Sequence, residues 1–210
     1  MDIESRIRYA LKYPFNGEES KYKPILIGGL FVVLSPFIIP FFTVFGYQLR
    51  VYEASIEKKP RPEFSGILSL TKEGFIATLA LVPAFILVGI FTSAPNILAT
   101  AGVAPQSLTS LVTFFLVILS TFISPIFLAI YVDTRSFSDT YDLTRVFSIL
   151  KNRDYLLQMI LFSLLSGLLQ IAAVFGSLFL ITIPFVSIFV VIVSSAYLGD
   201  MFRPYLDQTR

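Results

Sequence analysis

Cysteine and histidine are both absent from this 210-residue chain, and only 14% of its residues are charged. Without cysteine the chain can form no disulfide, no thiolate metal site and no cysteine nucleophile. Without histidine it also lacks the commonest metal ligand and general base. We therefore expect no metal site, no catalytic residue and no cofactor, and we predict that the protein is not an enzyme.

Charge of either sign is scarce and nearly balanced. Sixteen Lys and Arg residues against fourteen Asp and Glu residues give a net charge of +2, without the concentrated basic patch that nucleic-acid binding requires. Hydrophobic residues make up 55% of the chain, whereas soluble domains carry roughly 25% charged residues. We expect no nucleic-acid partner, and we predict an all-α integral membrane bundle that forms a single membrane domain over 1–210.

Three long runs contain no charged residue: 24–49, 74–132 and 155–199. A helix needs about 20 residues to cross about 30 Å of hydrocarbon, so the second and third runs are each long enough for two crossings. Turn-forming residues interrupt the second run at 94–96 and at 102–107. They predict a transmembrane hairpin with helices near 74–94 and 108–132.

The third run divides near Gly176 and Ser177, which leaves about 20 residues on each side. This division predicts a second transmembrane hairpin, with helices near 155–175 and 178–199. No short apolar core with a cleavage site precedes residue 24, so we expect no cleavable signal peptide.

All charged residues lie in four segments: 1–23, 50–73, 133–154 and 200–210. These segments carry 5, 5, 4 and 2 Lys and Arg residues. Because positively charged loops remain on the cytoplasmic side, all four segments should be cytoplasmic. We predict a multi-pass protein of the cell membrane with both termini in the cytoplasm.

The first run must then enter and leave the membrane by the same face. Pro36 and Pro40 would break the helical hydrogen bonds where a re-entrant turn needs them broken. We predict a re-entrant hairpin over 24–49, with Pro36 and Pro40 as the candidate helix break. The alternative is one spanning helix kinked by these prolines, which would place the basic residues of the tail on the opposite side from the others.

A short amphipathic stretch, with apolar residues at helical spacing, precedes each run. Such a helix can lie in the headgroup layer, where basic residues meet anionic lipid, or it can simply pack under the bundle. The apolar positions are Ile3, Ile7, Ala10 and Leu11 in the first stretch, Phe64, Ile67, Leu68 and Thr71 in the second, and Leu143, Val146, Phe147 and Leu150 in the third.

A tyrosine followed by an arginine marks the end of each run. Both residue types anchor helices at the membrane–water interface, because tyrosine has an apolar ring with a polar hydroxyl and arginine can extend its charge into water. The predicted interface anchors are Tyr47, Arg50, Tyr131, Arg135, Tyr197 and Arg203. Amphipathic stretch, hairpin and Tyr–Arg ending recur in the same order three times, which indicates a threefold internal pattern.

Five short segments resemble an archaeal membrane family known as domain of unknown function 4013. They are residues 8–15 (RYALKYPF), 27–30 (IGGL), 46–51 (GYQLRV), 154–156 (DYL) and 196–199 (AYLG). Their order and spacing carry the resemblance over nearly the whole chain. The resemblance implies a membrane protein of archaeal origin and supplies no activity.

The polar residues near the runs have structural explanations. We expect Asp133, Asp139 and Asp142 to form a solvated loop and a helix cap, and Asp200 to lie at a solvated helix end. A glutamine inside a span, such as Gln158 or Gln170, commonly bonds to a neighbouring helix. Small residues that allow close helix packing are Gly28, Gly29, Ser163, Gly167, Ser195 and Gly199.

We therefore predict a non-catalytic scaffold or lipid-interacting accessory protein. Its candidate lipid-headgroup contacts are Arg145, Lys151 and Arg153, and its partners are membrane lipids, with other membrane proteins or a second copy as further candidates. The alternative is a transporter or channel for a neutral or lipidic solute that uses the broken segment 24–49. A lipid-headgroup enzyme using loop carboxylates ranks below both.

Overall fold

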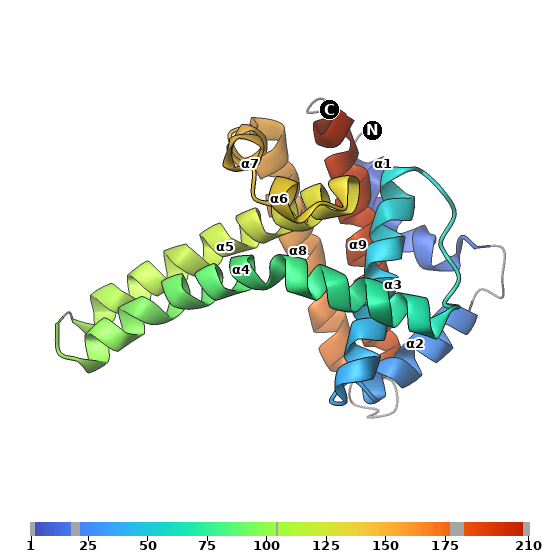
Figure 1. Cartoon of the computed structure of the whole chain (residues 1–210), viewed down its shortest axis with the longest axis horizontal. Coiled ribbons are helices and arrows are strands. Elements are labelled where there is room, and N and C mark those ends of the chain that lie inside the picture. The colour runs from blue at the N-terminus through green and yellow to red at the C-terminus, as the bar shows by residue number, and fades with distance from the viewer. Residues whose placement is uncertain (1–2, 18–21, 104, 177–182, 208–210) are drawn as a thin grey trace. The chain divides into compact units, whose positions relative to one another are not determined.

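The computed structural model describes residues 3–17, 22–103, 105–176 and 183–207, and every regular element within these ranges is helical. The predicted all-α class is therefore confirmed (Figure 1). The elements are α1 (Ile3–Lys12), η1 (Tyr13–Phe15), α2 (Lys23–Val33), α3 (Ile38–Ile56), α4 (Ile67–Thr100), α5 (Gln106–Thr134), α6 (Phe137–Thr140), α7 (Leu143–Leu150), α8 (Arg153–Gly176) and α9 (Ile183–Asp207).

Within the described part of the chain, four helices are long and apolar enough to cross a membrane: α4, α5, α8 and α9. They correspond to the two predicted hairpins. The predicted turn at Gly176 and Ser177 reaches into 177–182, which lies outside the described residues. Helix α2 is apolar but has only 11 residues, or about 16 Å at 1.5 Å per residue, which is too short to cross.

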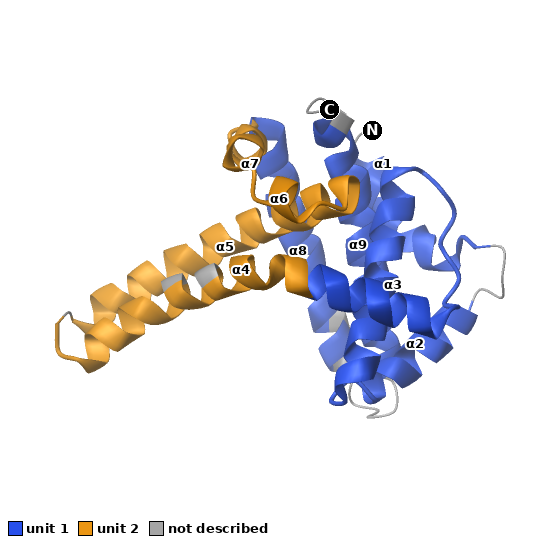
Figure 2. Cartoon of the chain, in the orientation of Figure 1, with its two compact units in different colours: residues 1–78, 153–210 blue, residues 79–152 orange. Residues whose placement is uncertain are grey.

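The chain divides into two compact units, shown in Figure 2. Unit 1 contains residues 1–78 and 153–210, and unit 2 contains residues 79–152. Helix α4 contributes its first part to unit 1 and the remainder to unit 2.

Helix α9 is the centre of unit 1 and packs against α1, α2, α3 and α8. Small residues on both sides permit this close approach. Gly28 and Gly29 of α2 face Ile188 and Phe185 of α9, while Gly199 of α9 lies against the backbone of α3. The predicted small-residue packing holds at these glycines, whereas Gly167 of α8 has no neighbour within 4 Å among the described residues.

Within unit 1, α3 and the start of α4 cross with their backbones in contact. A Cβ atom added to Gly46 would meet the carbonyl of Leu70, and one added to Gly74 would meet the carbonyl of Phe42. Beside this crossing the hydroxyls of Thr43 and Thr71 are 2.7 Å apart. Only glycine leaves room for backbones to approach this closely.

The helical path over 24–49 is broken between α2 and α3. The break contains Pro36 and is formed by two tight turns. The backbone N–H of Ser35 donates to the Val32 carbonyl at 3.1 Å, and that of Phe37 donates to the Leu34 carbonyl at 2.9 Å. Pro40 lies in the first turn of α3, where a missing N–H leaves no intrahelical bond unmade. The apolar side chains around the break are exposed on unit 1, with 72% exposure at Ile38.

The bounds of α4 differ from the sequence prediction at two places. It runs through Pro95 to Thr100, so the predicted interruption at 94–96 is wrong. Near this proline, the Thr92 hydroxyl donates to the carbonyl of Val88 and the Asn96 amide donates to the carbonyl of Thr92. The second predicted amphipathic stretch is not a separate helix either, because Ile67 begins α4 directly after Gly66, whose φ is +67°.

In unit 2, the side chain of Tyr141 inserts into the hydrogen-bond ladder of α4 near Pro83. The Tyr141 hydroxyl donates to the carbonyl of Ala80 at 2.6 Å, and the backbone N–H of Ala84 lies 3.4 Å from the same oxygen. These two backbone groups would otherwise bond to each other. A side chain inserted in this way is a recognised cause of helix bending.

Candidate functional site at Asp200 and Asp133

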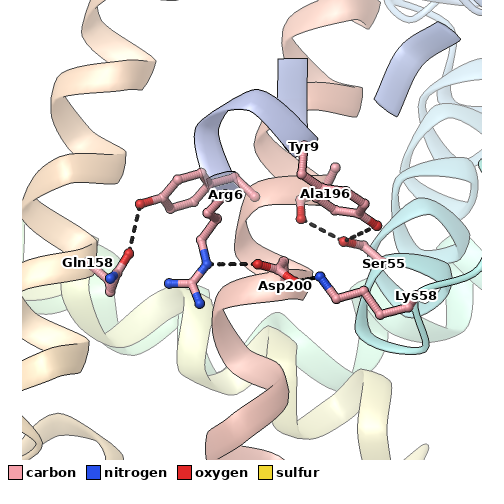
Figure 3. Close-up of polar contacts among 8 residues, drawn as sticks. Arg6, Tyr9, Ser55, Lys58, Gln158, Ala196 and Asp200 are labelled. Carbon is pink, nitrogen blue, oxygen red and sulfur yellow. Dashed lines mark hydrogen bonds and ion pairs between the residues drawn. The ribbon is translucent and has the colours of Figure 1, made fainter. Parts of the chain in front are cut away.

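The carboxylate of Asp200 is the most buried charge at the end of α9. Its side chain is 3% exposed, and the Arg6 Nε atom donates to its Oδ2 atom at 2.8 Å (Figure 3). The ammonium of Lys58 pairs with its Oδ1 atom. The expectation that Asp200 lies at a solvated helix end is therefore wrong, because two cations neutralise the charge inside the protein.

Arg6 reaches Asp200 from the buried face of α1. Arg6, Ala10 and Tyr13 follow one another at spacings of four and three residues, and all three are buried. Ile3 and Leu11, two of the apolar positions of this stretch, are 42% and 38% exposed. The buried face of α1 therefore combines Arg6 with Ala10, and part of its apolar side remains exposed.

Lys58 occupies a backbone position that usually belongs to glycine. It follows the C-terminus of α3 with φ +59°, and the N–H groups of Lys58 and Lys59 donate to Ser55 and Ala54. These two bonds form a Schellman motif, whose left-handed residue costs about 1 kcal/mol or more when it carries a side chain. The strained backbone places the ammonium at Asp200 and 4.3 Å from the ring centroid of Tyr9.

Cations gather around this carboxylate. Burial lowers the pKa of Lys58 from its ordinary value, and the positive charges of Arg203 and Arg6 add to this effect. Burial also lowers the pKa of Arg6. Arg6, Lys58 and Arg203 are thus close enough to one another to interact electrostatically.

Hydroxyl groups extend the polar cluster between the helices of unit 1. The Ser55 hydroxyl donates to the carbonyl of Ala196 at 2.6 Å and lies 3.4 Å from the Tyr9 hydroxyl (Figure 3). The Tyr197 hydroxyl donates to Gln158 Oε1 at 3.0 Å, which links α9 to α8. Gln158 therefore bonds across to a neighbouring helix as expected, whereas the side chain of Gln170 is exposed.

Unit 2 contains a second buried ion pair with the same chemistry. Arg145 of α7 donates to Asp133 at the end of α5 at 2.8 Å, and the two side chains are 11% and 3% exposed. Asp133 is thus not part of a solvated loop, contrary to expectation. Asp142 accepts from the N–H groups of Thr144 and Arg145, which confirms the predicted helix cap, and Asp139 is exposed.

The candidate lipid-headgroup contacts differ in their surroundings. Lys151, at the end of α7 in unit 2, and Arg153, at the start of α8 in unit 1, are exposed. Arg145 instead directs its charge to Asp133. Of the three residues, Lys151 and Arg153 are the ones whose side chains face outward.

The predicted interface anchors divide in a similar way. Tyr47, Tyr131 and Tyr197 are buried, and the hydroxyls of Tyr47 and Tyr197 bond to protein groups. The guanidinium of Arg50 makes two bonds, of 3.0 and 2.6 Å, to the carboxylate of Glu73. Arg135 and Arg203 are exposed, Arg135 with a φ of +51°.

The sequence contains a signal that would have identified both ion pairs. Each aspartate follows a run-ending tyrosine, since Asp133 comes two residues after Tyr131 and Asp200 three residues after Tyr197. Each partner arginine lies four residues before a fully buried side chain on a short helix, Ala10 or Ile149. An arginine on the inner stripe of a short helix therefore indicates a buried carboxylate partner.

A groove of about 770 Å³ lies beside α1 in unit 1. Its lining combines the cations Arg8 and Lys12 with the rings of Tyr9, Tyr13 and Phe15. Glu4 also lines it and pairs with Arg8 at 2.7 Å. Among the described residues, no group of three or more carboxylates is placed to hold a metal ion.

A family model described as protein of unknown function (DUF4013) matches residues 29–181 of the chain. This match includes the whole of unit 2 and parts of unit 1. No curated protein and no solved structure matches the chain.

Proposed function

We propose a function for this chain, which belongs to the DUF4013 family of proteins of unknown function. In this proposal it is a non-catalytic, multi-pass membrane protein that interacts with lipid. Its working surfaces are the short helices α1 and α7. Each would lie in the cytoplasmic headgroup layer, where exposed basic side chains contact anionic lipid.

One observation carries this proposal: each short helix is held by a buried ion pair but keeps large apolar side chains exposed. Arg6 ties α1 to Asp200, and Arg145 ties α7 to Asp133. A helix of this kind would be expected to bury its apolar residues if it served only to pack under the bundle. Leu143 and Phe147 of α7 nevertheless remain 58% and 51% exposed.

The groove beside α1 has the chemistry that an anionic headgroup needs. Arg8 and Lys12 supply positive charge, and the phenol rings of Tyr9 and Tyr13 supply surfaces that are apolar at one end and polar at the other. Phe15, which is 40% exposed at the rim, can contact the first carbons of a lipid chain. We assign this groove in unit 1 as the principal headgroup site.

The re-entrant path of 24–49 is part of the proposal. Arg6 precedes this segment and Lys58 follows it, and both pair with Asp200. Two charged residues that meet at one carboxylate lie on the same side of unit 1, which supports entry and exit by the same face. A spanning helix would separate them by the thickness of the bilayer.

Lipid retained by the purified protein tests the proposed function. Replacing Arg8 and Lys12 together with Gln should lower the retention of anionic lipid several-fold, because each basic residue near an anionic surface is worth about 1 kcal/mol. Lys151→Gln with Arg153→Gln should lower it as well. Native mass spectrometry of each protein, with lipid species counted, gives the measurement.

The matched control replaces Lys59 and Lys72, which are exposed and lie outside the α1 groove, with Gln. It removes the same charge and should leave retention close to that of the unaltered protein. Equal retention in all three double variants would show that these helices are not lipid-binding surfaces. Arg145→Gln is kept separate, because loss of its buried ion pair would alter folding.

Single-cysteine labelling tests the topology, and the natural absence of cysteine makes it clean. Probes at Lys12, Lys58 and Asp207 should all react only from the cytoplasmic side, and probes at Gln106 and Ser177 only from outside. Labelling of Lys12→Cys from outside, with Lys58→Cys protected, would replace the re-entrant hairpin with a spanning helix.

A further inference from the structure

Unit 2 contains an apolar pocket beneath α7. Its volume is about 240 Å³, and α4, α5 and α7 all contribute to its wall. Val88, Ser120, Phe127, Val146, Phe147 and Leu150 are among the lining residues. Because the pocket lies wholly within unit 2, its shape follows from the packing of these helices alone.

The pocket wall offers a ligand no free side-chain hydrogen-bond donor. Ser120 carries the one polar side chain among the lining residues, and its hydroxyl already donates to the carbonyl of Leu116 at 2.7 Å. A buried water needs two to four polar partners, so water is a poor occupant. Hydrocarbon is the chemistry that fits, because it gains contact with the apolar walls and asks for no polar partner.

The roof of the pocket is held in place independently of any ligand. Arg145 pairs with Asp133 of α5, and Asp142 caps the first turn of α7. The neighbouring Val146 is buried, whereas Phe147 lines the pocket and is half exposed. The wall of the pocket therefore meets the exposed surface of unit 2 at Phe147.

The end of α7 supplies charge complementarity for the head of the ligand. Leu150 lines the pocket, and the next residue is Lys151, whose side chain is exposed. Lys151 follows Phe147 by four residues and donates its N–H to the Phe147 carbonyl, so the two exposed side chains share one face at this helix end. A cation on the same face as a hydrocarbon pocket matches a molecule that is anionic at one end and apolar at the other. We infer that this pocket binds one hydrocarbon chain of an anionic membrane lipid, with its headgroup at Lys151.

This inference rests on the proposed lipid-binding function and adds a defined chain site in unit 2. The natural absence of tryptophan allows a direct test, because one introduced indole gives all the tryptophan fluorescence. Phe147→Trp places the indole at the pocket. Phe114→Trp, on the exposed surface of α5 where Phe114 is 60% exposed, is the matched control for ordinary contact with bulk lipid.

Each variant is placed in nanodiscs of phosphatidylcholine that contain a small fraction of lipid brominated on its acyl chain. The brominated lipid is either phosphatidylglycerol or phosphatidylcholine. For Phe147→Trp, we expect brominated phosphatidylglycerol to quench the tryptophan fluorescence at about fivefold lower mole fraction than brominated phosphatidylcholine. This factor is the gain in affinity of about 1 kcal/mol that one basic residue near an anionic headgroup provides. For Phe114→Trp, the two lipids should quench alike.

Two additional changes locate the effect. Lys151→Gln in the Phe147→Trp background should abolish the preference for the anionic lipid. Val88→Phe should fill the pocket and abolish quenching at low mole fraction, whereas Ile86→Phe, at a position 55% exposed on the same helix, should not. If Val88→Phe fails to fold, Lys151→Gln still decides the matter.

Equal quenching by the two brominated lipids at Phe147→Trp would overturn the inference. The inference would also be overturned if the indole became less quenched by brominated lipid as the protein concentration increased. That result would assign the pocket to a second copy of the chain. If the inference is overturned but lipid retention still depends on Arg8 and Lys12, only the proposed hydrocarbon-chain site in unit 2 is wrong. If retention is unaffected as well, the proposed function fails with it.

Discussion

Helices α9 and α5 are both long, apolar candidate spans, but they are buried to very different extents. In the most apolar stretch of α9, 61% of the residues are buried within unit 1, against 11% for α5 in unit 2. Small side chains at the helix contacts accompany the greater burial of α9. Helix α9 carries Ser195, Ala196 and Gly199 where its neighbours approach, whereas α5 exposes large side chains such as Phe114 and Phe115.

This comparison shows that hydrophobicity predicts which segments leave water but not which segments form the protein core. In apolar surroundings helices gain little by hiding apolar side chains from each other, so close packing and polar bonds decide the contacts. Helix α9 has both, through its small residues and through Asp200 and Tyr197. We therefore expect substitutions in unit 1 to destabilise the protein more than comparable substitutions in unit 2, and the following variants test this.

The largest effect should come from Gly199→Val. A Cβ atom at Gly199 would lie 2.6 Å from the Tyr52 carbonyl and 2.8 Å from Ser55 Cβ, so α3 would have to move. We expect a loss of more than about 4 kcal/mol in the free energy of unfolding, measured by SDS titration in mixed micelles. A Cβ atom added at Gly89 or at Gly167 would meet no other atom within 4 Å. Gly89→Val and Gly167→Val should therefore each lower the free energy of unfolding by less than about 1 kcal/mol. Similar losses at all three glycines would break the comparison.

Asp200→Asn should rank next. The change leaves Arg6 and Lys58 without their shared charged partner, and breaking a buried ion pair costs about 3–5 kcal/mol. Asp133→Asn, in unit 2, removes the charge opposite Arg145 and should cost less than Asp200→Asn. Asp139→Asn is the exposed control and should change the unfolding free energy by less than about 0.5 kcal/mol. A larger loss for Asp133→Asn would reverse the order of the two units.

Tyr141→Phe should have an intermediate effect and shows where unit 2 is sensitive. The Ala80 carbonyl and the Ala84 N–H would both lose the hydroxyl that lies between them. A buried backbone group left unsatisfied costs about 1–3 kcal/mol, and the loss becomes smaller to the extent that α4 closes the bond between these two groups. Tyr197→Phe in unit 1 removes a side chain–side chain bond and should cost about 1 kcal/mol. Thermal unfolding in one detergent compares the two variants directly. Should Tyr197→Phe prove the more costly, the inserted hydroxyl would not support α4.

The smallest expected effect separates two roles of Lys58. Lys58→Met and Lys58→Gly both remove the ammonium from Asp200, but only Lys58→Gly also relieves the left-handed backbone, where φ is +59°. Lys58→Gly should therefore be more stable than Lys58→Met by about 1 kcal/mol. The difference between the two denaturation midpoints measures this term. If Lys58→Met were equally stable, the backbone at this position would not be strained.

The long helices could be predicted because a helix apolar enough to cross a membrane has a local signature, the absence of charge over 20 or more residues. The break at Pro36 is similarly local, since proline removes an N–H wherever it stands. The length of α4 was not predictable in this way. A proline can end a helix or stand inside one, and Pro95 stands inside α4, so the residue type alone does not give the boundary.

The buried ion pairs were missed for a different reason. Arg6 and Asp200 are 194 positions apart, so no periodicity or motif connects them. The apolar spacing of α1 is compatible with an interfacial helix or a packed one, and it does not show that Arg6 is buried beside Ala10. A long-range electrostatic partner of this kind is identified only in the assembled fold.

The bond between Arg6 and Asp200 also bears on how the protein is made. A ribosome adds about 5–20 residues per second, so Arg6 leaves the ribosome roughly 10–40 seconds before Asp200 does. During that interval α1, α2 and α3 have no α9 to pack against, and the positive charges of Arg6 and Lys58 have no Asp200. Synthesis of the last helix is thus the step that completes unit 1, and nascent chains truncated before it should be the forms most exposed to cellular proteolysis.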